Sequence, residues 1–181
     1  MELITARTRM RPLEEGDLPG LREILQDPIA MTAYEHAFTE EEVQAWYRNQ
    51  LRRYREEDGL GLLAVLDRKN GAFLGQAGLT WQSVEADRVL EIGYLFCRRH
   101  WHKGYATEAA RALRAYAFET LGTGAVYSII RDSNLASQAV ARRNGMRPVR
   151  RFIKHYYNTD MPHDAWRITR EEFEALPEAE K

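Results

Sequence analysis

Apolar and polar residues alternate at the start of the chain and then recur at helical spacing. Between residues 5 and 12, small or apolar side chains alternate with three arginines, and this period of two predicts a half-buried strand. A first amphipathic helix follows, which Asp17 can cap and which ends before Pro28. A second helix begins at a capping box formed by Thr39 and Glu42. The apolar positions of the two helices are Leu18, Leu21, Ile24, Leu25, Val43, Trp46, Tyr47, Leu51 and Tyr54.

Short apolar runs and turn residues follow the two helices. Residues 60–66 and residues 73–81 flank Asn70-Gly71, a dipeptide that favours a tight hairpin turn. Residues 89–96 form a further, mostly apolar run of strand length. We therefore expect a hairpin followed by another strand.

A stripe of small side chains marks the next helix. Residues 104–121 place alanines at helical spacing, which lets a helix approach a sheet closely. Gly122 and Gly124 end this helix, and residues 125–130 then alternate in the manner of a central strand. The stripe consists of Ala106, Ala109, Ala110, Leu113 and Ala117.

The last part of the chain contains signals for two more helices and a pair of strands. Asn134 can cap a short helix, and Gly145 is a suitable residue just after its C-terminal end. Thr169 and Glu172 make a second capping box, which predicts a brief final helix as far as Leu176. The two strands between these helices are residues 149–156 and residues 164–168.

The predicted elements follow the order β-α-α-β-β-β-α-β-α-β-β. No linker, internal repeat or low-complexity segment interrupts this order. A chain of 181 residues is also long enough to bury a core without disulfides or metals. We therefore expect a mixed α/β protein (α+β in character) that forms one domain over residues 1–181.

Composition and charge narrow the classes of function. The chain is 44% hydrophobic and 29% charged, which is close to the average for globular proteins. It has 26 basic and 27 acidic residues, so its formal net charge is -1. Because proteins that bind nucleic acids usually carry a basic excess, we expect no nucleic-acid partner.

Cysteine usage and hydropathy point to a compartment. Cys97 is the single cysteine of the chain and has no internal partner for a disulfide. The first residues lack the apolar stretch of a signal peptide, and no run of about 18 apolar residues occurs anywhere. We expect a cytoplasmic protein with no membrane span.

A candidate anion site lies where the strand that ends near residue 96 leads into the helix that begins near Gly104. The first N–H groups of a helix have no partner inside it, and the helix dipole there favours negative charge. Gly104 and the small Ala106 permit close approach of a phosphate to the backbone. Positive charge is available nearby from Lys103, Arg98 and Arg99. A diphosphate fits this arrangement.

Other phosphate motifs can be tested directly against the sequence. Neither the P-loop string Gly-x-x-x-x-Gly-Lys-Ser/Thr nor the Rossmann string Gly-x-Gly-x-x-Gly occurs in it. Taken alone, Lys103 and Gly104 are equally compatible with an ordinary helix start, because short glycine motifs have many false positives.

Residues 101–106 resemble the signature of the GNAT acetyltransferase superfamily. That signature is Gln/Arg-x-x-Gly-x-Gly/Ala between the fourth strand and the following helix, and this chain has Trp-His-Lys-Gly-Tyr-Ala there. The first position departs from Gln or Arg. The longer string Trp-x-Lys-Gly-Tyr-Ala-Thr-Glu-Ala resembles the branch that contains the ribosomal-protein N-terminal acetyltransferases.

Two later segments carry the same resemblance. Residues 134–137, followed by a helix that ends in Gly-Met, are similar to the family's Asn-x-x-Ser/Ala helix that ends in Gly-Phe. Residues 162–172 resemble the closing strand and helix of the branch. The resemblance thus extends in the right order over residues 5–173.

The resemblance implies a fold and an activity. The GNAT fold has a central mixed, mostly antiparallel sheet flanked by helices. The implied activity is that of an acyltransferase, which moves an acetyl group from acetyl-CoA to an amine acceptor. Acetyl-CoA is then a co-substrate, with no permanently bound cofactor. The branch points to a protein N-terminal α-amine as the acceptor, and a polyamine, an amino sugar or another small amine is the rival. Family members are often dimers, so a homodimer is compatible with the sequence, which does not determine the oligomeric state.

Binding roles follow from the same resemblance. The backbone N–H near Phe96 would hold the thioester oxygen, and the backbone of Phe96 and Cys97 would pair with pantetheine. Asn134 can cap its helix and also bond pantetheine or a bound water. The residues that would hold the diphosphate are His102, Lys103, Gly104, Tyr105, Ala106 and Thr107.

The resemblance also assigns candidate catalytic residues. Glu91 stands where several members carry a general base, although a strand carboxylate that pairs with an arginine or faces solvent is an equally good interpretation. The family's usual acid is a tyrosine seven residues after Asn134, and this chain has Ala141 there. Ser137 is our first candidate for the acid, with Tyr157 or water as alternatives. The missing tyrosine also leaves open a module that binds acyl-CoA without turnover.

The histidines do not predict a metal site. His100 and His102 are close in sequence, but no third and fourth ligand at a suitable spacing completes a set. We expect no bound metal.

Overall fold

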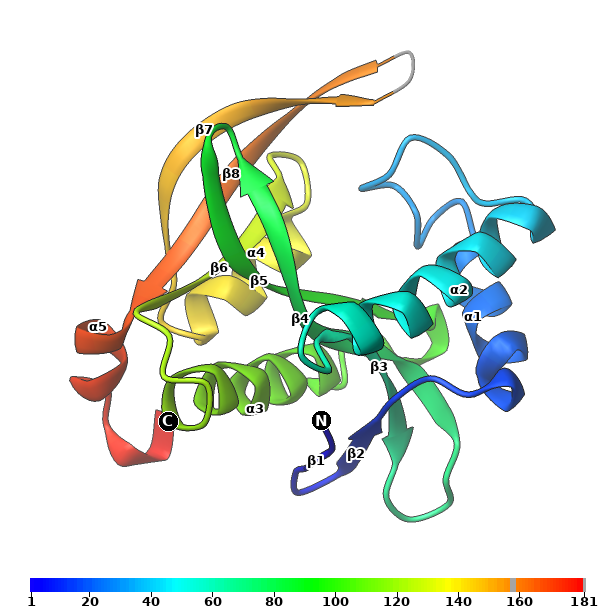
Figure 1. Cartoon of the computed structure of the whole chain (residues 1–181), viewed down its shortest axis with the longest axis horizontal. Coiled ribbons are helices and arrows are strands. Elements are labelled where there is room, and N and C mark those ends of the chain that lie inside the picture. Colours follow the sequence, from blue (N-terminus) through cyan, green and yellow to red (C-terminus); the bar gives the residue numbers. More distant parts are fainter. Residues whose placement is uncertain (157–158, 181) are drawn as a thin grey trace. The chain divides into compact units, whose positions relative to one another are not determined.

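The computed structural model describes residues 1–156 and 159–180. The chain divides into two units (Figure 1). The first unit contains Met1–Gly78 and Tyr94–Ala109, and the second contains Leu79–Gly93 and Ala110–Lys181. The prediction of one domain over the whole chain stays a prediction.

Three elements begin in one unit and end in the other. They are the strands β4 (Phe73–Val84) and β5 (Asp87–Phe96) and the helix α3 (Tyr105–Glu119). The hairpin of β4 and β5 is longer than the sequence predicts, because its turn at residues 85–86 lacks any Gly or Asn-Gly signal.

Hydrogen bonding links the eight strands into one order. That order is β1 (Leu3–Ile4), β2 (Thr8–Arg11), β3 (Gly61–Asp67), β4, β5, β6 (Ala125–Arg131), β8 (Thr159–Thr169) and β7 (Arg147–Tyr156). The pairs β1–β2, β2–β3, β6–β8 and β7–β8 are antiparallel, whereas β5 and β6 are parallel. The expected mixed, mostly antiparallel sheet with flanking helices is therefore confirmed.

The first unit begins with short antiparallel strands. β1 (Leu3–Ile4) pairs with β2 (Thr8–Arg11), and β2 pairs with β3 (Gly61–Asp67). Thr8 and Met10 are buried, as the period of two predicts. The hairpin turn between β3 and β4 is held by the side chain of Asn70, which accepts a hydrogen bond from the N–H of Ala72 at 2.9 Å. This hairpin is confirmed.

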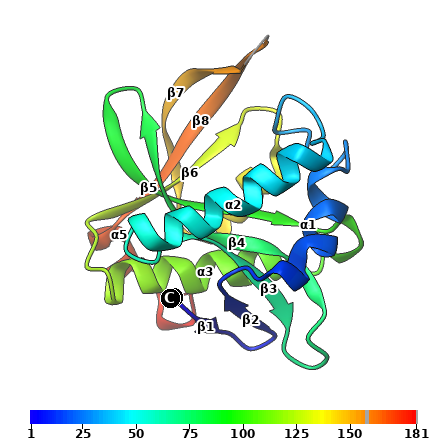
Figure 2. The same ribbon diagram turned by 45° about the vertical axis from the view of Figure 1, so that its right-hand side comes forward.

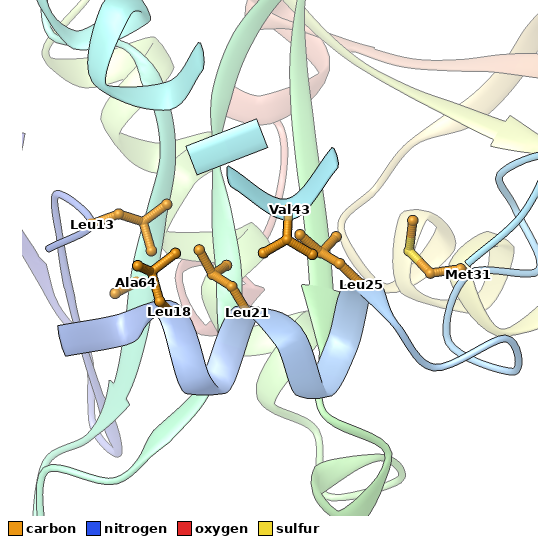
Figure 3. Packing of buried hydrophobic residues seen from close by; sticks show 7 residues of the cluster. All are labelled: Leu13, Leu18, Leu21, Leu25, Met31, Val43 and Ala64. Carbon is orange, nitrogen blue, oxygen red and sulfur yellow. The ribbon is translucent and has the colours of Figure 1, made fainter. Parts of the chain in front are cut away.

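Two helices of the first unit pack beside β3 (Figure 2). A 3-10 turn at Glu15–Asp17 leads into α1 (Leu18–Leu25), and α2 spans Glu40–Glu56. Figure 3 shows the apolar face of α1 turned toward Val43 and Ala64. Thr39 and Glu42 form the predicted capping box of α2. The buried cluster comprises Leu13, Leu18, Leu21, Leu25, Met31, Val43 and Ala64.

Asp17 does not cap α1 through its side chain, so that prediction is wrong. The Asp17 carboxylate turns back toward the preceding turn, where it accepts hydrogen bonds from the N–H of Glu14 at 2.8 Å and from Arg11 at 2.7 Å. The guanidinium of Arg11 and the N–H of Glu14 therefore take the Asp17 carboxylate in place of the N–H groups at the start of α1.

The second unit contains the remaining strands. β6 spans Ala125–Arg131, β7 spans Arg147–Tyr156 and β8 spans Thr159–Thr169. β8 is paired with β6 on one side and with β7 on the other. The two long strands β7 and β8 form the orange ribbon of Figure 1. All three strands extend beyond the bounds predicted from the sequence.

The cap signals of the second unit are found, but only α4 ends where the sequence predicts. α4 spans Leu135–Arg143, and Gly145 follows it with a φ of 75°, a conformation that glycine adopts readily. α5 spans only Arg170–Glu174 after the confirmed capping box, so it stops short of Leu176. On α3 the side chains of Ala109, Ala110, Leu113 and Ala117 are buried, as expected. Two further 3-10 turns lie at Arg98–His100 and Glu178–Glu180. Among the described residues, no helix is long and apolar enough to cross a membrane.

Candidate functional site

The loop before α3 leaves helix N–H groups open to a ligand. Residues 101–104 are exposed, and the N–H of Glu108 donates to the carbonyl of Gly104 at 3.1 Å. This bond opens the hydrogen-bond ladder of α3. Because a helix cannot satisfy its first N–H groups, those of Tyr105, Ala106 and Thr107 have no acceptor within the helix. Such groups form an anion site.

The backbone of this loop needs a glycine at residue 104. Gly104 has a φ of 82°, in the left-handed region that side chains with a Cβ disfavour. A Cβ built there would have one near neighbour within 4 Å, Nη2 of Arg7 at 3.3 Å. His102 also has a positive φ of 59°. The loop therefore turns sharply at His102 and Gly104, and residues 101–104 are exposed to solvent.

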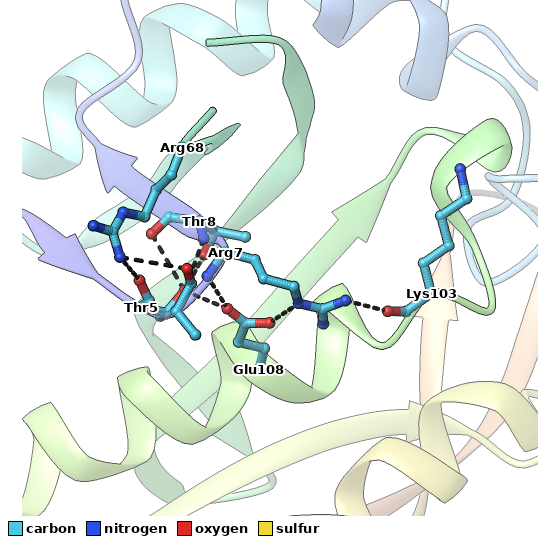
Figure 4. Close-up of polar contacts among 7 residues, drawn as sticks. Thr5, Arg7, Thr8, Arg68, Lys103 and Glu108 are labelled. Atoms are coloured by element: carbon cyan, nitrogen blue, oxygen red, sulfur yellow. Dashed lines mark hydrogen bonds and ion pairs between the residues drawn. The ribbon is translucent and has the colours of Figure 1, made fainter. Parts of the chain in front are cut away.

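A network of polar contacts fixes the loop to the start of β2 (Figure 4). Arg7 donates from Nε to Glu108 at 2.6 Å, from its backbone N–H to Glu108 at 2.8 Å, and from Nη1 to the carbonyl of Lys103 at 2.8 Å. The guanidinium also lies over the ring of Tyr105, 4.6 Å from its centroid. The hydroxyl of Thr5 donates to Glu108 at 2.5 Å.

This network keeps Glu108 charged. Burial alone would raise the pKa of Glu108, but hydrogen bonds from Thr5 and from Arg7 outweigh burial and hold the pKa below its usual value. Sequence reasoning missed Thr5, Arg7 and Glu108 as site residues. The alternating pattern of residues 5–12 marks Arg7 only as the exposed face of a strand.

The basic residues of the loop have different partners. Arg98 pairs with Asp27 at 2.6 Å, and Arg99 pairs with Glu23, so both charges are already neutralised. Lys103 has no ion-pair partner within residues 1–156 and 159–180. Its ammonium group points away from the Arg7 network in Figure 4. Burial, followed by the charges of Arg99 and Lys103, lowers the pKa of His100. Lys103 therefore supplies the positive charge that favours an anion at this loop.

The backbone groups of Cys97 are used inside the first unit. Its N–H donates to the carbonyl of Leu74 at 3.0 Å, and its carbonyl accepts from the N–H of His100 at 2.9 Å. The carbonyl of Phe96 accepts from the indole N–H of Trp101 at 2.8 Å. Burial raises the pKa of the Cys97 thiol to about 12, so it stays protonated near neutral pH.

Glu91 lies in the second unit, where it joins two strands. The N–H of Ile129 donates to Oε1 of Glu91 at 3.2 Å, and the hydroxyl of Ser128 donates to the carbonyl of Ile92 at 3.0 Å. The register of β5 and β6 pairs Glu91 with Tyr127, so these side-chain bonds come just after that pair. Part of the binding capacity of Glu91 is therefore used structurally.

Asn134 and Ser137 also lie in the second unit. The side chain of Asn134 accepts a hydrogen bond from the N–H of Ser137 at 3.1 Å, which confirms its capping role. Ser137 is half-buried and Ala141 is buried. Tyr157, the alternative acid, lies outside the described residues. Phe96, Cys97 and residues 102–107 form one group in the first unit, whereas Glu91, Asn134 and Ser137 lie in the second.

Within residues 1–156 and 159–180, no three His, Cys, Asp or Glu side chains are grouped as a metal site would require.

Comparisons with known proteins cover most of the chain. Residues 7–147 match the family model "Acetyltransferase (GNAT) domain". The protein YkkB of Bacillus subtilis is 39% identical over 146 residues, which cover 80% of this chain and 84% of that protein. The FsC-acetyl coenzyme A-N(2)-transacetylase of Aspergillus fumigatus is 31% identical over 166 residues, covering 85% and 68% respectively. A GNAT-family acetyltransferase structure from Bacillus anthracis matches with a TM-score of 0.80 and 23% identity, over 94% of this chain and 99% of that one.

Proposed function

Because the chain belongs to the GNAT acetyltransferase family, we propose that it transfers the acetyl group of acetyl-CoA to a primary amine. The observation that carries the choice of donor is the start of α3, where the first N–H groups of the helix follow Gly104. The name of the fungal relative, which specifies acetyl coenzyme A and a nitrogen acceptor, supports the same donor and acceptor chemistry.

The diphosphate of the donor would lie against the N-terminus of α3. Backbone N–H groups at the start of α3 would bind the phosphate oxygens, and they belong to Tyr105, Ala106 and Thr107. Gly104, which has no side chain, leaves room for the diphosphate to approach the backbone. His102 shapes the turn through its positive φ, and Lys103 supplies an unpaired cation. The residues thus fit a dianionic ligand in both geometry and charge.

Phe96 and Cys97 are the proposed contacts for pantetheine. Since both backbone groups of Cys97 already have partners in the protein, we expect Phe96 to supply more of this contact. Asn134 is proposed to contact pantetheine or a bound water with the part of its amide that does not cap α4. Cys97 is not proposed as a nucleophile, because its thiol is buried and protonated.

The reaction forms an amide C–N bond and breaks a thioester C–S bond. The attacking amine must lose a proton, and the departing sulfur must gain one. We assign the first role to Glu91, acting directly or through water, and the second to Ser137. The family resemblance places Glu91 at the general-base position, and its Oε1 accepts a hydrogen bond from the N–H of Ile129.

Two acceptor classes remain to be separated. The string at residues 101–109 resembles ribosomal-protein N-terminal acetyltransferases, so the first proposal is a protein N-terminal α-amine. The second candidate is a small amine such as a polyamine or an amino sugar, and the name of a relative that is 31% identical specifies acetyl transfer to a nitrogen.

The test is thiol release from acetyl-CoA in the presence of a panel of amines. The panel contains peptides with free N-termini, the same peptides with formylated N-termini, polyamines and amino sugars. Release with free peptides but not with formylated ones supports the first acceptor class, and release with small amines alone supports the second. CoA binding without release for any amine would leave only a binding module. Failure of CoA to raise the melting temperature would refute the donor site itself.

A further inference from the structure

We propose that Arg7 is a positioning residue for the diphosphate loop, which it holds in its binding conformation while neutralising Glu108. This inference rests on the proposed acetyl-CoA site. It assigns to the loop a support from the bend just before β2, about a hundred residues earlier in the sequence.

The contact between Arg7 and Lys103 orients the peptide plane that joins Lys103 to Gly104. Nη1 of Arg7 binds the carbonyl oxygen of Lys103 at 2.8 Å. In a planar trans peptide the C=O of one residue and the N–H of the next point in opposite directions. The N–H of Gly104 therefore points away from Arg7. Arg7 thus fixes the direction in which the loop offers this donor.

Arg7 also offsets the negative charge of Glu108 at the helix N-terminus. Glu108 lies in the first turn of α3, where an acidic side chain is stabilised by the helix dipole but repels any other anion there. Its side chain is only 17% exposed, so solvent screens its charge weakly. The guanidinium of Arg7 at 2.6 Å offsets this charge. A diphosphate can then approach the same helix end without facing an unpaired carboxylate.

Arg7 is itself held in place by contacts of both its backbone and its side chain. Its backbone N–H donates to Glu108 and its carbonyl accepts from the N–H of Arg68 at 3.0 Å. Its guanidinium is held at Nε, at Nη1 and by the ring of Tyr105. A planar fork with several fixed contacts makes arginine suited to this role, and lysine cannot reproduce it.

The experiment compares Arg7→Met with Arg9→Met. Arg9 lies two residues further along the chain, in β2, is about as exposed as Arg7 and pairs with Glu2, so it controls for loss of a surface arginine. Dissociation constants are measured for acetyl-CoA and for S-acetylpantetheine, which lacks the diphosphate, by ligand-observed NMR. We expect Arg7→Met to weaken acetyl-CoA binding about tenfold, the scale of a lost charged hydrogen bond. Binding of S-acetylpantetheine should change less than twofold, and Arg9→Met should affect neither ligand.

A second pair of variants separates positioning from general support of the fold. In Arg7→Met, the unpaired Glu108 would repel the diphosphate, so adding Glu108→Gln should restore part of the lost acetyl-CoA affinity. Arg7→Lys, which keeps the charge but loses the fork, should bind acetyl-CoA with intermediate affinity and serves if Arg7→Met does not fold.

Several outcomes overturn the inference. Wild-type acetyl-CoA affinity in Arg7→Met would refute positioning by Arg7. Equal weakening of both ligands, or no gain in affinity when Glu108→Gln is added, would refute it as well. If the wild-type protein binds no acetyl-CoA, the proposed function fails first, and that failure is distinct from a wild-type protein that binds while Arg7→Met is unaffected.

Discussion

Gly104 and Gly122 are a matched pair of residues for testing the donor site. Both have a φ in the left-handed region, 82° and 70°, and no backbone atom crowds either position within 4 Å. Replacing either by valine should therefore cost about 1–2 kcal/mol or more of folding free energy from backbone strain. Only Gly104→Val should lose CoA affinity, by about tenfold or more, because Gly104 lies in the proposed diphosphate loop and a Cβ there, 3.3 Å from Nη2 of Arg7, would displace that loop.

Urea unfolding and calorimetric titration with CoA check the two effects separately. Equal CoA affinity for a folded Gly104→Val and for Gly122→Val would contradict the placement of the diphosphate.

At the residue scale, the sequence predicts what depends on close neighbours. Gly104 follows a strand and opens a helix, so its role can be inferred from a short string. Arg7 and Glu108 are 101 positions apart, and their pairing depends on how β2 and α3 come together in the first unit. No local pattern distinguishes Arg7 from the other exposed arginines of its strand. The same limit leaves the catalytic roles of Glu91 and Ser137 as predictions.

At the element scale, the capping box of α2 offers a direct test of helix stability. The hydroxyl of Thr39 accepts from the N–H of Glu42 at 3.3 Å, and the carboxylate of Glu42 accepts from the N–H of Thr39 at 2.8 Å. Thr39→Ala should lower the free energy of unfolding by about 1 kcal/mol, because one helix N–H loses its acceptor. Thr39→Ser keeps the hydroxyl and should stay close to wild type. Urea denaturation of the three proteins measures the difference, and equal midpoints for the Ala and Ser variants would argue against the cap.

Element boundaries were predictable where the stop or start signal is local. The boxes at Thr39 and Thr169 each join residues three apart, and both occur as expected. Asp17 differs because Arg11 competes for its carboxylate, and that competition arises from the path of the chain before α1. The turn after Val84 places Glu85 at a φ of 54°, an uncommon state for a residue with a side chain that the sequence does not announce.

At the scale of the whole molecule, the pH dependence of stability should include a contribution from His163. This side chain is 3% exposed, and its Nδ1 contacts the carbonyl of Met161 at 2.9 Å. Burial is the main cause that lowers its pKa below the usual value, so the native state favours neutral imidazole. A depressed pKa stabilises the fold at pH values above the unfolded pKa of about 6.5, and this stabilisation is lost as the pH falls below it.

The melting temperature of the wild-type protein should therefore fall between pH 7.5 and pH 5, and His163→Gln should fall less over the same range. His155, whose side chain is 76% exposed and pairs with Asp160, is the matched control. His155→Gln removes an exposed histidine and is followed over the same pH range. An identical slope for all three proteins would show that His163 contributes nothing to it.

The architecture of the whole molecule was predictable because hydrophobic periodicity and a family resemblance agree along nearly the entire sequence. The mixed, mostly antiparallel sheet and the membership of the GNAT family are both found. The acceptor was not predictable in the same way. A fold shared by many enzymes carries no information on the groups that recognise one amine rather than another.

The burial of Cys97 also determines how the protein can be labelled. The chain has one thiol, and that thiol is inaccessible and protonated, so maleimide reagents should leave the native wild-type protein unmodified. A cysteine introduced at an exposed position, such as Leu135→Cys at the start of α4 where the native side chain is 72% exposed, would then be the preferred attachment point. A fluorophore can thus be attached to this protein at a chosen site without first replacing Cys97.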